Sequence, residues 1–164
     1  METRAGDPIE LARQNWIEAG WGAAADGMAF VTSLMRAQQL VMARIEEVLR
    51  PHGLTFARFE VLRLLAFSRH GVLPVGKVGE RLQVHPASVT NAVQRLEDAG
   101  LVARSANPAD GRSVLAAITP AGRRLVEACT GLLNREVFTP LPLDPDEREA
   151  ATAALASLRR GLGD

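Results

Sequence analysis

Tyrosine is absent from this chain, and cysteine occurs once, at Cys129, among 164 residues. A single cysteine excludes an internal disulfide framework and a metal site made of several cysteines. No apolar run is long enough to cross a bilayer. The polar and acidic start, METRAGDPIELARQ, lacks the apolar segment of a secretory signal. We therefore expect a cytoplasmic protein that makes no contact with a membrane.

The sequence also lacks the short motifs of the common enzyme classes. It contains no phosphate-binding loop, no Gly-x-Ser-x-Gly, no Cys-x-x-Cys and no His-Glu-x-x-His. The histidines at positions 52, 70 and 85 are scattered and do not have the close spacing of metal ligands. A lone helical cysteine at an apolar position is more often buried and inert than redox-active, so we expect no redox switch at Cys129. The sequence thus predicts a protein that is not an enzyme and needs no metal or cofactor.

Neither sign of charge is in excess, since 19 Lys and Arg residues balance 19 Asp and Glu residues. The balance is uneven along the chain. Residues 1–53 carry 5 basic and 7 acidic side chains, residues 54–120 carry 8 and 5, and residues 121–164 carry 6 and 7. The middle segment therefore has a net charge of +3 between flanks of −2 and −1. This excess is modest, so any non-specific binding to nucleic acid should be weak and salt-sensitive.

Residues 86–99 have the pattern of an amphipathic helix with an unusual polar side. Pro86 suits the first position of a helix, where its missing N–H is not needed. Val89, Val93 and Leu96 recur at spacings of four and three, which places them on one buried stripe. Asparagine and glutamine suit readout of adenine, and arginine suits guanine or a phosphate. The other side carries side chains of these kinds, short or flexible and mostly uncharged: Ser88, Thr90, Asn91, Gln94 and Arg95.

A two-stranded hairpin is predicted directly after this helix. Gly100 ends the helix, residues 101–103 start a strand, residues 107–111 have turn chemistry, and residues 114–118 return as the second strand. Arg112 sits beside the tip, where a guanidinium can enter a narrow minor groove of DNA. Asp110 lies two residues earlier, and on an extended segment its side chain shares a face with Arg112 and can hold it in place.

Two shorter helices are expected before the polar helix. Thr55 suits the N-cap of a helix that buries Phe59, Leu62 and Leu65. Residues 75–82 form a second, weak helix, because two glycines and the preceding proline leave it dependent on packing. Residues 83–85 are then the turn, with His85 as a cap, and the arrangement is a helix-turn-helix.

The motifs of this segment resemble the MarR family of bacterial regulators. DGRSVLAAIT, residues 110–119, is similar to that family's wing signature, and SVTNAVQRLEDAGLV, residues 88–102, is similar to its recognition helix and following strand. The resemblance continues upstream through LTFARFEVLRLL, residues 54–65, and covers roughly residues 28–162. It implies a winged helix-turn-helix homodimer that binds operator DNA and often releases it when a small molecule binds.

The helices outside this module have apolar stripes that flank it instead of covering it. They are expected over residues 8–20 and 26–50, from Thr119-Pro120 to the prolines at 140 and 142, and after the Asp144 cap. A stripe without a partner inside the chain suggests a partner outside it. An ordinary monomeric core is one interpretation. A homodimer that presents two recognition helices to successive major grooves is the other, and the family resemblance favours it.

One feature resembles the urate- or purine-responsive branch of the same family. In that branch an effector pocket is formed by a Trp of the first helix, an acid before the helix-turn-helix, and two arginines. Trp16, Glu60 and Arg104 match three of these positions, with Glu60 in place of Asp. The recognition-helix arginine is absent, because Ala92 follows Thr90-Asn91. The alternative is that Trp16 packs in a dimer and Arg104 binds a phosphate.

The sequence therefore predicts a mainly α protein with a small antiparallel β wing, in one domain over residues 1–164. Residues 8–53 and 120–162 form the helical dimerisation region, and residues 54–119 form the DNA-binding winged helix-turn-helix. The expected function is sequence-specific binding to palindromic operator DNA, with repression relieved by a small anionic or aromatic ligand. The alternative is a winged-helix protein-interaction module without specific DNA binding, against which the polar face of residues 88–95 argues.

Overall fold

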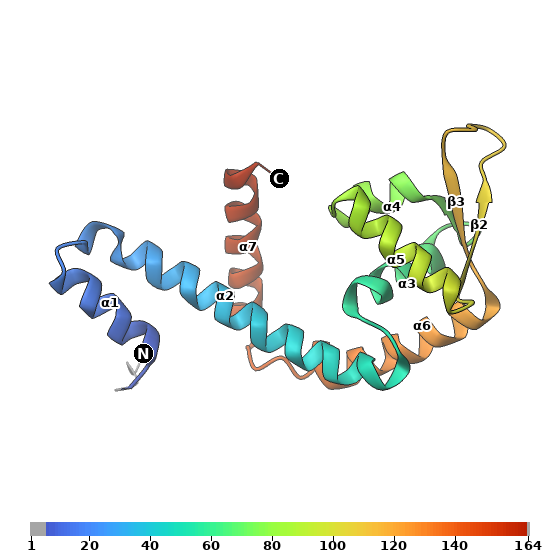
Figure 1. Cartoon of the computed structure of the whole chain (residues 1–164). Coiled ribbons are helices and arrows are strands. Elements are labelled where there is room, and N and C mark those ends of the chain that lie inside the picture. Colours follow the sequence, from blue (N-terminus) through green and yellow to red (C-terminus); the bar gives the residue numbers. More distant parts are fainter. Residues whose placement is uncertain (1–5, 164) are drawn as a thin grey trace.

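The computed structural model describes residues 6–163. Residues 1–5, part of the start that argues against a secretory signal, and Asp164 lie outside the described residues. In chain order (Figure 1) the helices and strands are α1 (Pro8–Glu18), α2 (Gly22–Leu49), α3 (Phe56–Phe67), β1 (Val72–Pro74), α4 (Val75–Leu82), α5 (Pro86–Asp98), β2 (Val102–Ala106), β3 (Val114–Ile118), α6 (Pro120–Leu133) and α7 (Pro145–Leu162). A 3₁₀ turn, η1 (Arg50–His52), follows α2, and a π-helical turn, η2 (Asn134–Phe138), follows α6.

Side-chain caps fix where five of the described helices begin. Asp7 caps α1 by accepting from the N–H of Ile9 at 2.9 Å. Thr55, Thr119 and Asp144 accept hydrogen bonds from the first-turn backbone N–H groups of α3, α6 and α7. The Nδ1 atom of His85 accepts from the N–H of Ala87 at 3.2 Å and caps α5. The caps at Thr55, His85, Thr119 and Asp144 were predicted from the sequence and are confirmed. The start of α2 differs, since it begins at Gly22 rather than near residue 26.

The wing is part of a three-stranded antiparallel sheet with the strand order β1-β3-β2. The prediction of a two-stranded hairpin was incomplete, because Val72–Pro74 pairs with β3 on the side opposite β2. Three residues that end in proline are too few to show the alternation typical of a strand. The third strand is therefore a product of long-range pairing with residues 115–117.

The core of the winged module is formed by the predicted apolar stripes. Val89, Val93 and Leu96 of α5 are buried, as are Phe59, Leu62 and Leu65 of α3. The buried stripe of α6, Val126, Cys129 and Leu133, belongs to the same core. This corrects the expectation that α6 leaves its stripe for a partner, because α3 of the same chain covers it.

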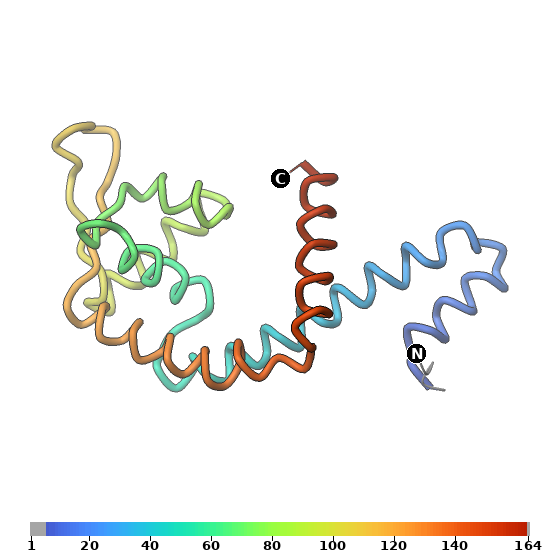
Figure 2. The backbone as a smooth tube through the Cα atoms, turned by 180° about the vertical axis from the view of Figure 1, so that it is seen from behind, coloured from blue at the N-terminus to red at the C-terminus, as the bar shows by residue number. Residues whose placement is uncertain are grey.

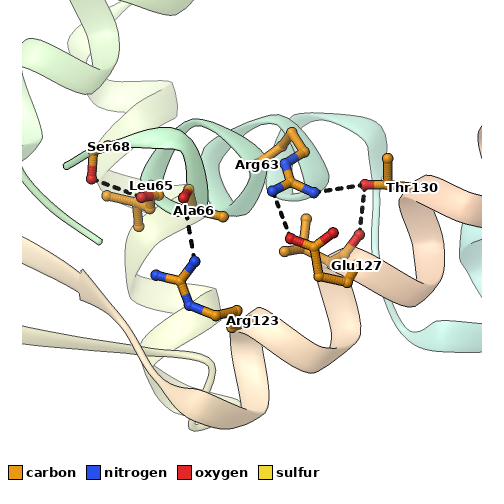
Figure 3. Close-up of polar contacts among 8 residues, drawn as sticks. Arg63, Leu65, Ala66, Ser68, Arg123, Glu127 and Thr130 are labelled. Atoms are coloured by element: carbon orange, nitrogen blue, oxygen red, sulfur yellow. Dashed lines mark hydrogen bonds and ion pairs between the residues drawn. The ribbon is translucent and has the colours of Figure 1, made fainter. Parts of the chain in front are cut away.

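Arg63 on α3 reinforces the contact between α3 and α6 (Figure 3). Its guanidinium donates to Glu127 at 2.8 Å and to Thr130 at 3.2 Å on α6, and it lies 4.2 Å from the centre of the Phe67 ring. Arg123 of α6 donates to the carbonyl of Ala66. The hydrogen bond from Arg63 lowers the pKa of Glu127. The winged module is thus joined to α6 by both apolar and charged contacts.

The other helices extend away from this module. In Figures 1 and 2, α2 forms a long arm, α1 folds back along the far end of α2, and α7 stands apart from the winged module. Arg13 of α1 donates to Asp26 of α2 at 2.7 Å, and the Trp16 and Trp21 rings meet edge to face at 5.4 Å. Within the part of the chain that is described, α7 buries none of its residues. No helix within residues 6–163 is long and apolar enough to span a bilayer.

Candidate nucleic-acid interface

Helix α5 presents two different polar sides around its buried stripe. Thr90, Gln94 and Glu97 lie on the side toward the wing, and Ser88, Asn91 and Arg95 lie on the side toward α3, as the helical spacing requires. The first set, with the exception of Thr90, is only partly exposed, and the second set is exposed. The two sides therefore offer different groups to a ligand.

Side chains of the same chain occupy the wing side of α5. The Nε of Arg104 on β2 donates to Glu97 at 2.6 Å, and a terminal nitrogen of Arg104 donates to the amide oxygen of Gln94. The amide nitrogen of Gln94 donates to Asp98 at 2.8 Å. The hydroxyl of Thr90 donates to the carbonyl of Pro86 at 3.0 Å. Gln94, predicted as a reader of bases, thus has intramolecular partners at both ends of its amide.

The side of α5 toward α3 is unoccupied. Within residues 6–163, the side chains of Ser88, Asn91 and Arg95 make no hydrogen bond or ion pair. They line one groove of about 690 Å³ together with Thr55 and Arg58 at the start of α3. Free amide, hydroxyl and guanidinium groups on an exposed helix face are the groups that read base edges and bind phosphates.

Hydrogen bonds within the turn shape the wing tip. Asn107 donates from its amide to the hydroxyl of Ser113 at 2.7 Å and accepts from the N–H of Ala109 at 3.0 Å. Asp110 accepts from the backbone N–H of Arg112 at 3.1 Å. The expected contact between the two side chains is therefore replaced by one to the backbone, because residues 108–112 form a turn and not an extended segment. The exposed Arg112 side chain projects from a turn whose geometry Asp110 fixes.

Close packing of α4 holds α5 at its start. A Cβ added at Gly79 would lie 3.3 Å from the side chain of Val89, so glycine allows the two helices to approach closely. Gln83 adopts a left-handed conformation with φ of 54° and ends α4. The weak helix expected over residues 75–82 is therefore formed, and its tertiary contacts support it.

Sequence reasoning missed two residues of this surface. Glu97 was not singled out, although it fixes Arg104, and Arg58 was treated as part of an ordinary helix. A signal for Arg58 was present, since it lies three residues after the N-cap Thr55 at the open start of α3. No local signal links Glu97 to Arg104, because their contact joins a helix to a strand.

Comparison with known proteins identifies the family to which this chain belongs. The MarR family model matches residues 52–113. The HTH-type transcriptional repressor Rv2887 of Mycobacterium tuberculosis is 34% identical over 119 residues, which are 71% of this chain and 84% of that protein. The structure of the MarR family regulator Sco5413 from Streptomyces coelicolor is 49% identical, has a TM-score of 0.77, and aligns over 85% of this chain and 96% of that one. The chain belongs to the MarR family.

A further MarR relative concerns a ligand. The structure of BpsR from Bordetella bronchiseptica is 31% identical, has a TM-score of 0.70, and aligns over 78% of this chain and 91% of that one. DNA binding by BpsR is regulated by 6-hydroxynicotinic acid. The MarR relatives are transcriptional regulators, which are not enzymes. The winged helix-turn-helix fold and the regulatory class predicted from the sequence are thereby confirmed.

The three effector residues suggested by the urate-responsive branch of the MarR family lie in separate places in one chain. Trp16 contacts Trp21 at the far end of α2 from the winged module (Figure 1). Glu60 lines a small cavity between α3, α4 and α5, where burial raises its pKa. Arg104 lines a different cavity, with Thr90 and Arg112, and is paired with Glu97.

Within residues 6–163, the single cysteine is buried and the potential metal ligands do not cluster. No group of three or more His, Cys, Asp or Glu side chains gathers within residues 6–163. Cys129 is buried in the core, and burial raises the pKa of its thiol. A raised thiol pKa lowers the fraction of thiolate, which is the reactive form.

Proposed function

We propose that this MarR protein is a homodimeric repressor that binds a palindromic operator through α5 and the wing. The observation that carries the proposal is the unoccupied polar side of α5, beside a wing whose tip bears Arg112. Predicted contacts to DNA are made by Ser88, Thr90, Asn91, Gln94, Arg95 and Arg112, with Asp110 shaping the tip. Of these, Gln94 has to give up its partners Arg104 and Asp98 to contact a base. Asn91 is the best-placed base reader, since its amide has no partner in the described chain.

Exposed apolar side chains support the homodimer. Large hydrophobic residues are exposed along the helices outside the winged module, among them Leu11, Phe30, Val31, Met35, Leu40, Val41, Leu155 and Leu162. They lie on α1, on α2 and on α7. The C-terminal end of α2 packs into the core through Ile45, Val48 and Leu49, whereas α7 buries none of its described residues. A second copy that covers the exposed residues would bury them, and its two-fold axis would match the symmetry of a palindrome. A repressor of this kind is expected in the cytoplasm, together with the DNA that it binds.

A small anionic or aromatic ligand is proposed to relieve repression. The regulation of BpsR by 6-hydroxynicotinic acid supports this class of ligand. Arg104 lines a cavity beside Thr90 and is the group that such an anion would use in the winged module, in competition with its ion-pair partner Glu97. The ligand can only act through its different affinity for the DNA-bound and free states.

Selection of bound sequences tests the proposal. Purified protein at near-physiological salt is incubated with a pool of random DNA duplexes, and bound duplexes are amplified and sequenced. We expect enrichment of one palindrome with half-site centres about 34–36 Å apart, one turn of DNA. Addition of 6-hydroxynicotinic acid, urate or salicylate to the enriched complex then tests relief by a ligand.

The variant Asn91→Ala serves as the specificity control. It should shift the base preference at one position of each half-site, by about 1–3 kcal/mol of discrimination. Absence of any enriched sequence, with only salt-labile binding, would refute operator recognition and favour the protein-interaction module.

A further inference from the structure

The groove between α3 and α5 contains two guanidinium groups and no carboxylate among its lining residues. Arg58 comes from the first turn of α3 and Arg95 from the second half of α5. Neither forms an ion pair within residues 6–163. Arg104 on the other side of α5 is different, because Glu97 neutralises it at 2.6 Å. The uncompensated positive charge beside α5 therefore lies on the α3 side.

Arg58 is held in a fixed position at this groove. Its Nε donates to the hydroxyl of Thr55 at 3.2 Å, and the same hydroxyl accepts from the N–H of Arg58 as the cap of α3. The two terminal nitrogens of Arg58 have no hydrogen-bond partner in the described chain. A guanidinium that is already oriented loses less conformational freedom when it binds a ligand. Its free nitrogens are the pair that binds an oxyanion in a bidentate manner.

Two acidic side chains lie near this end of α3, and neither lines the groove. Glu60 of α3 lines a neighbouring cavity that shares Ala57, Ser88 and Ala92 with the groove. Glu46 of α2 accepts a hydrogen bond from the N–H of Phe56 at 3.1 Å and does not line the groove. Two guanidinium groups that line one groove without a carboxylate in its lining favour the binding of an anion there. The hydroxyl of Ser88 and the amide of Asn91, which line the same groove, add neutral donors.

We propose that Arg58 and Arg95 bind the phosphodiester backbone of the DNA strand beside the major groove that α5 enters. The inference rests on the proposed function, and it adds α3 to the DNA-binding surface. It assigns Arg95 to a phosphate instead of a guanine. It also makes Arg58 a positioning residue that carries no sequence information, because phosphates are the same at every base pair.

Salt dependence of DNA binding tests the proposal. The affinity of the wild type, Arg58→Gln and Arg58→Lys is measured on the selected operator and on a scrambled duplex, by fluorescence anisotropy at several NaCl concentrations. Each lost phosphate contact should reduce the slope of log K against log salt by about 0.9, and a dimer loses two. The glutamine variant should therefore bind about 30-fold more weakly at 0.15 M salt, equally on both duplexes. The lysine variant keeps the charge and should keep the slope.

Arg135→Gln is the matched control, because this exposed arginine on η2 lies outside the winged module and removal of its charge should leave the slope unchanged. Thermal unfolding of each variant verifies that it is folded. An unchanged slope for Arg58→Gln on an operator that the wild type binds would overturn the phosphate contact and leave operator recognition intact. A loss confined to the operator would show that Arg58 reads bases. Failure of the wild type to bind either duplex would overturn both proposals.

Discussion

Arg104 of β2 and Glu97 of α5 form an ion pair at 2.6 Å that joins the wing to the recognition helix. The guanidinium of Arg104 also donates to the amide oxygen of Gln94, so one arginine fixes two residues of α5. Both charged side chains are about one-third exposed, at 32% and 31%. Solvent screens a pair of this kind, so its effect on the free energy of unfolding should be below about 1 kcal/mol. Its main consequence is to neutralise a positive charge beside the proposed DNA-binding face.

Glu97→Gln should therefore change DNA binding more than stability. Removal of the carboxylate releases Arg104, and the affinity for non-specific DNA should rise while the slope of log K against log salt steepens by about one to two. Anisotropy titrations on a scrambled duplex measure both. Glu149→Gln on α7 removes the same charge at an exposed site and should have no effect. Weaker binding of Glu97→Gln on every duplex would show instead that the ion pair is needed to position the wing.

Arg112→Ala should abolish tight operator binding and leave the fold intact. The side chain projects from the wing turn, which is held by hydrogen bonds of Asn107, Asp110 and Ser113 that the substitution does not remove. Titration of the selected operator measures the affinity, and circular dichroism measures the helix content. Unchanged affinity would exclude the wing tip from the interface.

Gly122→Ala should destabilise the protein by about 1–3 kcal/mol. Gly122 lies buried in the first turn of α6, and an added Cβ would overlap the carbonyl oxygen of Leu101 and lie 3.0 Å from Ile118. Gly131→Ala on the same helix is the control, because an added Cβ there meets open space and alanine favours a helix by up to about 1 kcal/mol. Urea denaturation should show opposite changes in the free energy of unfolding. Equal effects of the two substitutions would contradict the close contact of α6 with the start of β2.

Glu60→Gln should alter how stability depends on pH. Burial raises the pKa of Glu60, and the other side chains that line its cavity are not ionisable. At pH values between the pKa of Glu60 in the unfolded protein, about 4.3, and its raised pKa in the folded protein, the folded protein binds more protons than the unfolded protein. The contribution of Glu60 to stability is thus present at low pH and is lost as pH rises through the folded value. The stability of Glu60→Gln relative to wild type should therefore increase from pH 4 to pH 8 in urea denaturation, and a constant difference would contradict the burial effect.

Leu155→Glu should prevent formation of the proposed homodimer. Leu155 lies on the apolar stripe of α7 and is exposed in the single chain. A glutamate in an apolar interface would be buried without a partner, which is strongly unfavourable. Ala153→Glu places the same residue on the opposite side of α7 and should leave the dimer intact. Sedimentation velocity distinguishes the two, and a wild type that sediments as a monomer would refute the homodimer itself.

Local signals in the sequence were sufficient for much of this protein. The caps at Thr55, His85, Thr119 and Asp144 were predictable because each involves a side chain and a backbone N–H two or three residues away. The buried stripe of α5 was predictable because helical spacing alone places Val89, Val93 and Leu96 on one face. The turn of the wing follows from Asn107, Pro108 and Gly111, whose conformational preferences need no partner.

Tertiary structure decided the rest, since it depends on contacts between segments that are distant in the chain. Val72–Pro74 is a strand only because β3 pairs with it, and the stripe of α6 is buried only because α3 lies against it. The pairing of Arg104 with Glu97 withdraws Gln94 from the free face of α5, and the packing of α3 places Arg58 in the groove with Arg95. Periodicity determines which side of a helix is polar. Only the packed neighbours determine which of those polar groups remain free to bind DNA.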